Sequence, residues 1–196
     1  MILTHRLQEA INAASRLHRD QIRKDSDKTP YISHVVGVMI LLSSATHDED
    51  VLIAGLLHDA LEDVADYTPE ILEQQFGARV KEIVMGVTEE FKLRNETPPS
   101  WKEEKLLYLE TLKVSTDESL MVSLADKIQN TRSLIEMINL SKGEEHPKFA
   151  STHDDRLWFH QEVLALCEER LGEDYVLVEE LRGELREMKR VLETFA

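Results

Sequence analysis

Four polar side chains interrupt the otherwise apolar segment VLIAGLLHDALEDV at residues 51–64. They are His58, Asp59, Glu62 and Asp63. Residues four apart share a face of a helix, so each of the first two aligns with one of the last two. Carboxylates are costly to bury without partners, and a bound cation removes that cost. A single His-Asp pair is explained more simply by an exposed helix end, so a metal site needs further ligands elsewhere in the chain.

Two such residues lie in other apolar segments. His34 falls early in YISHVVGVMILL, and Asp126 falls within LMVSLADKIQNTRSL. Each has an ordinary alternative, a hydrogen-bonded core histidine or an aspartate paired to a neighbouring base. Taken together, two imidazoles and two carboxylates from three apolar helices predict a divalent metal site. Such a set leaves positions open on a six-coordinate Mn²⁺, with Fe²⁺ or another transition metal as the alternative, and tetrahedral zinc is less natural.

The order of these residues resembles the HD phosphohydrolase superfamily. The finer pattern resembles its (p)ppGpp-hydrolase branch, which comprises the hydrolase domains of the RelA/SpoT enzymes and stand-alone small alarmone hydrolases. The resemblance covers about residues 5–140. It is carried by four stretches in the same order, RKDSDKTPYISH, AGLLHDALEDV, FGARVKEIVMGVTEE and SLADKIQNTRSL.

The resemblance implies a role for each matching residue. It implies metal ligation by His34, His58, Asp59 and Asp126. It implies that Glu62 and Asp63 activate or orient the attacking water. Nucleotide contacts would come from Arg23, Lys24, Tyr31, Lys127 and Asn130. The implied activity is metal-dependent removal of the 3′-pyrophosphate from guanosine 3′,5′-bis(diphosphate), (p)ppGpp.

Several departures from the family pattern bear on the substrate. Val35 replaces a proline, Ser123 stands where a lysine often precedes Leu-Ala-Asp, and Gln129 replaces a histidine or tyrosine. The loop DSDKT is also longer than the common form. Two alternatives therefore stay open: an HD-type phosphatase or pyrophosphohydrolase for another nucleotide, and a non-catalytic nucleotide-binding module. Against the second alternative, every ligand and acidic position is retained.

In the segments that carry these residues, apolar residues recur with a helical period, and no alternating strand pattern is evident. We therefore predict an all-α fold, and the resemblance implies a single-domain HD-domain helical bundle with extra C-terminal helices. Threonine caps and a proline mark helix starts, as in Thr68-Pro69. The helices are predicted at about residues 4–18, 31–44, 51–64, 68–77, 78–91, 101–113 and 117–138, with two more after a connector at 140–149.

The chain is expected to divide into an HD-type phosphohydrolase core at 1–140 and C-terminal helices at 141–196 that are packed on or extend the same domain. The last segment has one apolar stripe, which predicts a helix docked on its own domain, with a dimerisation helix and a homo-oligomer as the alternative. The stripe is formed by Val178, Leu181, Leu185, Met188 and Leu192. The single cysteine, Cys167, excludes an internal disulfide and is read as a buried structural thiol.

Charge and composition narrow the partners. The 196 residues carry a formal net charge of -15, which argues against nucleic-acid and anionic-membrane partners. No apolar run is long enough to span a bilayer, and the start of the chain lacks a signal-peptide stretch, so a cytoplasmic protein is expected. The helical, acidic last third predicts no synthetase domain. A nucleotide substrate then requires a local basic patch, and the loop RKDSDK supplies Arg23, Lys24 and Lys28.

Overall fold

The computed structural model describes residues 3–24, 28–93, 100–145 and 150–195, and within these ranges every regular element is a helix. The all-α prediction is confirmed. In chain order the helices are α1 (His5–Leu17), α2 (Ile32–Ala45), α3 (Glu49–Leu57), α4 (Ala60–Asp63), α5 (Pro69–Phe76), α6 (Ala78–Met85), α7 (Glu90–Leu93), α8 (Trp101–Val114), α9 (Asp117–Ser141), α10 (His153–Leu171) and α11 (Val176–Phe195).

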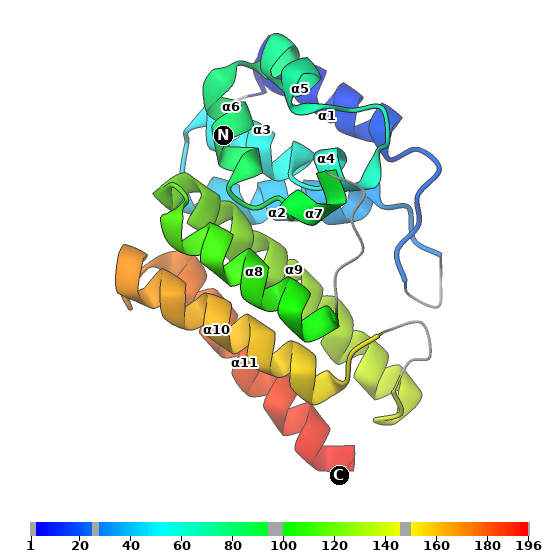
Figure 1. The fold of residues 1–196 in the computed structure, drawn as a ribbon. Coiled ribbons are helices and arrows are strands. Elements are labelled where there is room, and N and C mark those ends of the chain that lie inside the picture. Colours follow the sequence, from blue (N-terminus) through cyan, green and yellow to red (C-terminus); the bar gives the residue numbers. More distant parts are fainter. Residues whose placement is uncertain (1–2, 25–27, 94–99, 146–149, 196) are drawn as a thin grey trace.

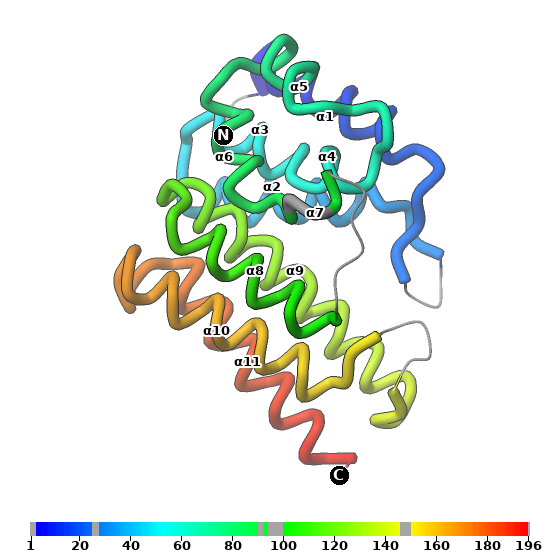
Figure 2. The backbone as a smooth tube through the Cα atoms, viewed as in Figure 1, coloured from blue at the N-terminus to red at the C-terminus, as the bar shows by residue number. Residues whose placement is uncertain are grey.

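Helix α9 is the central element of the fold. It contacts α2, α3 and α6 on one side and α10 and α11 on another. Helices α8 to α11 run side by side as a bundle, while α1, α3, α5 and α6 gather above this bundle in the view of Figures 1 and 2. Because α9 contacts α2 and α3 directly, residues on these three helices can meet inside the molecule.

Within the described ranges no helix has both the length and the apolar character needed to cross a bilayer.

Local sequence signals explain where several helices begin. Thr4, Thr68 and Thr116 each accept a hydrogen bond from a backbone N–H in the first turn of the helix that follows. Thr152 forms a complete capping box with Asp155 at the start of α10. Such caps satisfy N–H groups that have no partner within the helix.

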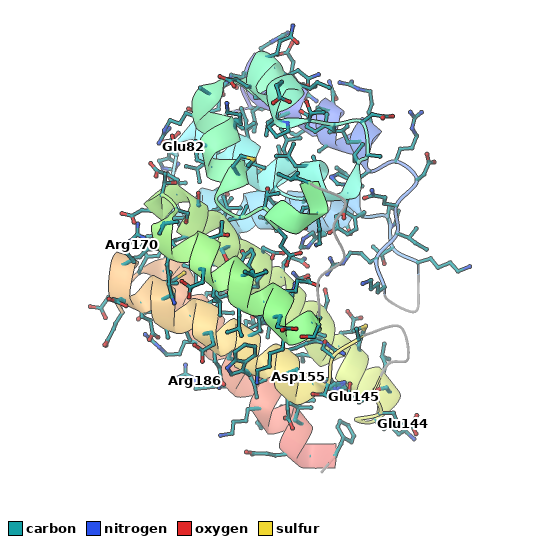
Figure 3. The ribbon with its side chains drawn as sticks, viewed as in Figure 1. Glu82, Glu144, Glu145, Asp155, Arg170 and Arg186 are labelled. Atoms are coloured by element: carbon teal, nitrogen blue, oxygen red, sulfur yellow. The ribbon has the colours of Figure 1, made fainter. Side chains whose placement is uncertain are left out.

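The main hydrophobic core extends from α1 to α11, and a smaller second cluster lies between α9 and α11. Leu7 on α1, Leu56 on α3, Leu124 on α9 and Val178 on α11 belong to the same buried cluster. The predicted division at residue 140 falls inside the last turn of α9 and stays a prediction. In contrast to this apolar core, the outer faces of the helices carry charged side chains (Figure 3). Burial raises the pKa of the Cys167 thiol to about 12, so it stays protonated.

The apolar stripe of the last helix lies against the protein's own bundle. Four of its predicted members, Val178, Leu181, Leu185 and Met188, are buried in α11, and Leu192 is half-buried. Helix α11 contacts α9 and α10 along this stripe. In this structure the stripe therefore packs against the protein's own helices, and the homo-oligomer stays a prediction.

Two predicted helices are interrupted. The helix predicted over 51–64 ends at Leu57 and restarts at Ala60, because Asp59 adopts φ −92° and ψ −7°, outside the ideal helical values. Neighbouring side chains of a continuous helix point about 100° apart. The interruption instead lets the side chains of His58 and Asp59 converge, with His58 Nε2 3.0 Å from Asp59 Oδ2. The helix predicted over 78–91 ends at Met85, and the short α7 follows.

The end of α6 is set by a close approach to α9. A Cβ atom at Gly86 would overlap the hydroxyl of Ser119 and lie 2.8 Å from the Cβ of Ser115. We expect Gly86→Ala to lower the free energy of unfolding by about 1–3 kcal/mol through this overpacking. Gly183→Ala is the matched control, because nothing lies within 4 Å of its added methyl group. In the helix α11 it should raise stability by about 0.5–1 kcal/mol. Urea denaturation measures both, and an unchanged midpoint for Gly86→Ala would contradict the packing described.

Candidate metal centre and active site

The predicted metal ligands converge from three parts of the fold. His34 lies in the first turn of α2, His58 and Asp59 at the interruption between α3 and α4, and Asp126 in the middle of α9. One ligand atom from each of His34, His58 and Asp126 lies within 4.8 Å of the others. Asp59 Oδ2 lies 3.0 Å from His58 Nε2 and 3.5 Å from His34 Nε2. The structure thus brings all four predicted ligands together.

The chemistry of this set fits a bound cation. His58 Nδ1 lies 2.9 Å from the carbonyl oxygen of Gly55, so Nδ1 carries a proton and Nε2 is the ring nitrogen that would face an ion. His58 Nε2 is buried and has no hydrogen-bond partner among the described residues, although it faces the two carboxylates. His34 Nε2 also faces Asp126, with Oδ1 at 3.2 Å. A divalent ion would satisfy the two nitrogens and both carboxylates.

The centre carries strong mutual electrostatic interactions without an ion. Burial alone would lower the pKa of His58, but Asp59 and Asp126 raise it well above its ordinary value. Burial alone would raise the pKa of Asp59, yet His58 and His34 hold it well below the usual range. Lys127 and the two imidazoles have the same effect on Asp126. The carboxylates are therefore ionised, which is the form that binds metal.

The predicted acidic pair lies in α4, one turn beyond Asp59. Glu62 Oε1 accepts a hydrogen bond from the backbone N–H of Glu89 at 2.8 Å, and Oε2 accepts one from Lys92 Nζ at 2.5 Å. Burial raises the pKa of Glu62 to about 7, with Lys92 opposing the rise. Burial and Asp59 also raise the pKa of Asp63. A carboxyl group with a pKa near 7 is suited to proton transfer at neutral pH.

A cleft of about 790 Å³ opens above this centre. All five predicted nucleotide-contact residues, Arg23, Lys24, Tyr31, Lys127 and Asn130, line it together with Asp59, Glu62 and Asp63. Arg23 donates to Asn130 Oδ1 at 2.9 Å and to the Ser133 hydroxyl at 3.2 Å. Lys127 is ion-paired with Asp126. Lys28 is not among the lining residues, so the expectation of three cations from one loop is only partly met.

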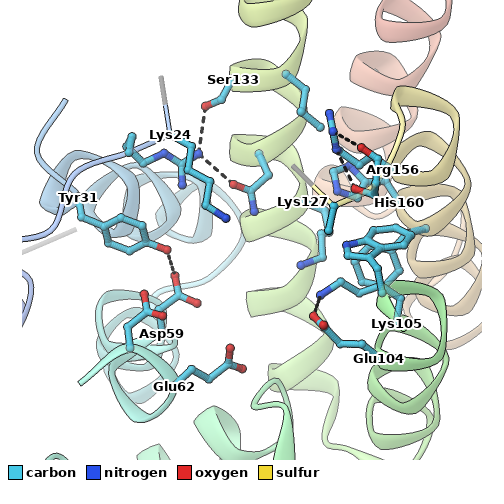
Figure 4. A pocket seen from close by; sticks show the side chains of 18 of the residues that line it. Lys24, Tyr31, Asp59, Glu62, Glu104, Lys105, Lys127, Ser133, Arg156 and His160 are labelled. Atoms are coloured by element: carbon cyan, nitrogen blue, oxygen red, sulfur yellow. Dashed lines mark hydrogen bonds and ion pairs between the residues drawn. The ribbon is translucent and has the colours of Figure 1, made fainter. Parts of the chain in front are cut away.

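The residues of a second wall of the cleft were not predicted from the sequence. It is formed by Trp101, Lys105, Arg156, Phe159 and His160 from α8 and α10, with Lys92 from α7. Figure 4 shows Tyr31 and Asp59 on one side of the cleft and Lys105, Arg156 and His160 on the other. Cationic side chains therefore line two sides of the cleft, although the protein as a whole is acidic.

The spacing of two residues on α10 could have indicated from the sequence that they share a site. Arg156 and His160 are four residues apart and share a helix face. Both are buried, which is unusual for residues of this kind. His160 Nδ1 lies 2.8 Å from the hydroxyl of Thr131, and burial lowers the pKa of His160 to about 3. His160 is therefore neutral where it lines the cleft.

Comparison with known proteins identifies the family. A family model described as an HD domain matches residues 10–154. The chain belongs to the HD-domain family. Membership implies a divalent metal, and the cluster of His34, His58 and Asp126 is where this HD domain could hold one.

Relatives of this HD domain have closely related names. The zebrafish (Danio rerio) protein named guanosine-3′,5′-bis(diphosphate) 3′-pyrophosphohydrolase MESH1 is 41% identical over 130 residues, which cover 65% of this chain and 68% of the relative. The human protein of the same name is 40% identical over 130 residues, 65% and 69% of the two chains. A solved structure described as a metazoan orthologue of SpoT that hydrolyses ppGpp superimposes with a TM-score of 0.77 at 28% identity, covering 98% of this chain and 99% of that one. The HD fold is confirmed along almost the whole chain.

The departures from the family pattern lie in different surroundings. Val35 is buried in the core, and Gln129 lies against Gly37 of α2. Ser123, in contrast, lines a smaller cavity of about 170 Å³ beside the metal centre, together with His58 and Asp126. Its hydroxyl lies 2.8 Å from that of Tyr108. Of these three residues, Ser123 is the one that lines this cavity together with the proposed ligands.

Proposed function

We propose that this HD protein is a metal-dependent nucleotide phosphohydrolase that removes the 3′-diphosphate of (p)ppGpp. The observation that carries the proposal is the cluster of two imidazoles and two carboxylates, with the half-buried Glu62 nearby, beside a cleft with cations on two sides. The names and the fold of the relatives support the same substrate.

We propose His34, His58, Asp59 and Asp126 as the ligands, with Mn²⁺ as the metal and Fe²⁺ as the alternative. Two nitrogen and two oxygen donors leave positions on a six-coordinate ion for water and substrate. When bound, the ion would lower the pKa of a coordinated water and polarise a phosphoryl oxygen. The Nδ1–H of His58 donates to the Gly55 carbonyl oxygen and so fixes the nitrogen that would face the ion.

Glu62 is proposed as the general base, with Asp63 orienting the same water. Glu62 accepts the proton as the water oxygen attacks the phosphorus attached to the ribose 3′ oxygen. The bond between that phosphorus and the 3′ oxygen breaks, and the 3′ oxygen takes up a proton. Pyrophosphate and the guanosine nucleotide with its 5′ phosphates are then released. Lys92 and the Glu89 backbone N–H hold the Glu62 carboxylate in place for this step.

The nucleotide would lie between the two walls of the cleft. We propose that Arg23, Lys24 and Asn130 contact the nucleotide from one wall, where Arg23 and Asn130 are already joined by a hydrogen bond. Lys127 lies next to the proposed ligand Asp126 and would neutralise phosphate charge close to the metal. These local cations offset a net charge of -15, which otherwise repels a polyphosphate.

A product assay tests the substrate. Protein treated with a chelator and reloaded with Mn²⁺ is given ppGpp and a panel of other nucleotides, and released pyrophosphate and orthophosphate are measured separately. We expect pyrophosphate from ppGpp and little turnover of the rest. Turnover confined to other nucleotides would favour a different HD phosphohydrolase, a candidate supported by Ser123 beside the metal centre. No bound metal and no turnover would indicate a nucleotide-binding module.

We also propose that the protein acts in the cytoplasm on a small nucleotide, without nucleic-acid or membrane partners. The support is its strongly negative charge, which disfavours binding to polyanions.

A further inference from the structure

Tyr31 occupies a position between the proposed nucleotide wall and the metal centre. Its hydroxyl donates a hydrogen bond to Asp59 Oδ2 at 2.6 Å (Figure 4). That same oxygen is the one 3.0 Å from His58 Nε2 and 3.5 Å from His34 Nε2. The hydroxyl therefore contacts the carboxylate oxygen that faces the imidazoles.

The surroundings of Tyr31 hold its ring in this orientation. The ring centroid lies 5.1 Å from that of His18 and 5.3 Å from that of His34, the latter in an edge-on arrangement. The guanidinium of Arg23 lies 5.7 Å from the ring centroid. The backbone N–H of Tyr31 also donates to the Gln21 carbonyl oxygen at 3.0 Å. Aromatic contacts of this kind favour defined ring geometries, so the hydroxyl is directed at Asp59 by packing.

The hydroxyl remains a proton donor. The phenol group carries a single O–H donor. An ionised carboxylate, in turn, can only accept hydrogen bonds. The direction of the hydrogen bond is thus fixed.

We propose that Tyr31 is a positioning residue for the metal, which acts through Asp59 rather than through the substrate. Its hydrogen bond orients the Asp59 carboxylate toward the two imidazoles before an ion arrives. Partners that hydrogen-bond metal ligands typically account for a 10–100-fold difference in metal affinity. This inference rests on the proposed metal site, and it changes the role that the sequence assigned to Tyr31, which was a nucleotide contact.

Mn²⁺ binding to the nucleotide-free full-length chain provides the test. Tyr31→Phe removes one oxygen atom and keeps the ring, and calorimetry should show an affinity for Mn²⁺ about 10-fold or more below that of the wild type. Tyr67→Phe is the matched control, because it also removes a hydroxyl hydrogen bond of a buried tyrosine, to Gln75 Oε1 at 2.9 Å, away from the centre. The control should bind Mn²⁺ as the wild type does.

A second background tests whether the effect passes through Asp59. Asp59→Ala should weaken Mn²⁺ binding but leave His34, His58 and Asp126 as a possible ligand group. Adding Tyr31→Phe to this protein should cause no further loss of Mn²⁺ affinity, because the residue through which it acts is gone. An equal loss in both backgrounds would overturn the proposal, as a general disturbance of the fold would produce it. Wild-type affinity in Tyr31→Phe, with only a higher KM, would also overturn it and return Tyr31 to the substrate. A wild-type chain that binds no Mn²⁺ would overturn the proposed metal site as well.

Discussion

Replacing Asp126 with alanine is expected to abolish metal binding and to lower phosphohydrolase activity by about 10³-fold or more, since the metal supplies several kcal/mol of transition-state stabilisation. Asp126 Oδ1 lies 3.2 Å from His34 Nε2 and 3.7 Å from His58 Nε2, so this carboxylate faces both imidazoles. Without it, two neutral nitrogens and Asp59 are left to hold a doubly charged ion. Metal content per chain, measured on dialysed protein, checks the expectation directly.

This variant also removes the ion-pair partner of the buried Lys127. Asp126→Asn, which keeps the size of the side chain, should therefore be measured beside it, and circular dichroism should confirm that both proteins are folded. Asp117→Ala is the control on the same helix, because Asp117 pairs with Arg170 far from the centre. It should keep its metal. If folded Asp126→Ala retained metal at the wild-type level, the proposed ligand set would be wrong.

Replacing Glu62 with glutamine is expected to leave the metal in place and to reduce kcat by about 10²–10⁴-fold, the usual contribution of a general base. The amide oxygen can still accept the hydrogen bond from the Glu89 N–H, but a neutral amide cannot take a proton from the attacking water. The raised pKa of Glu62, about 7 through burial, supports this residue rather than an ordinary surface carboxylate. Metal content and single-turnover rates together separate binding from chemistry.

The matched control for this substitution is Glu70→Gln, at an exposed position in the first turn of α5. It should leave both metal content and kcat unchanged. Loss of the metal from Glu62→Gln would show that Glu62 is a ligand, and the division of roles between Asp59 and Glu62 would then have to be redrawn.

The residues of the proposed metal centre stand out in the sequence because they interrupt apolar helices, and the resemblance to the HD superfamily implied that they form one ligand set. A histidine or aspartate inside an apolar helix has no solvated face, so His34 and Asp126 were conspicuous even before their proximity was known. The interruption between α3 and α4 was not foreseeable in the same way, since the helical period continues through residues 51–64. Whether a helix breaks at Asp59 depends on what the two side chains meet across the fold, and periodicity carries no such information.

The second wall of the cleft could not be predicted from the sequence for a different reason. Lys92 and Lys105 flank a polar segment with two prolines, where lysines are unremarkable. Their position becomes significant only when α8 and α10 fold back beside the metal centre, where Lys105 meets the buried Glu89 carboxylate at 2.7 Å. Long-range packing of this kind brings together residues separated by many turns of chain. Only the spacing of Arg156 and His160 offered a local clue.

We propose that an ion held by His34, His58, Asp59 and Asp126 is required to release pyrophosphate from ppGpp. The most direct measurement follows pyrophosphate release by metal-free protein as Mn²⁺ is added back, with bound metal determined on the same samples. We predict that the rate rises in proportion to bound metal, levels off at a single ion per chain, and yields pyrophosphate in step with the guanosine nucleotide. Full turnover before any metal is added, or a fully loaded protein that leaves ppGpp intact, would contradict the account.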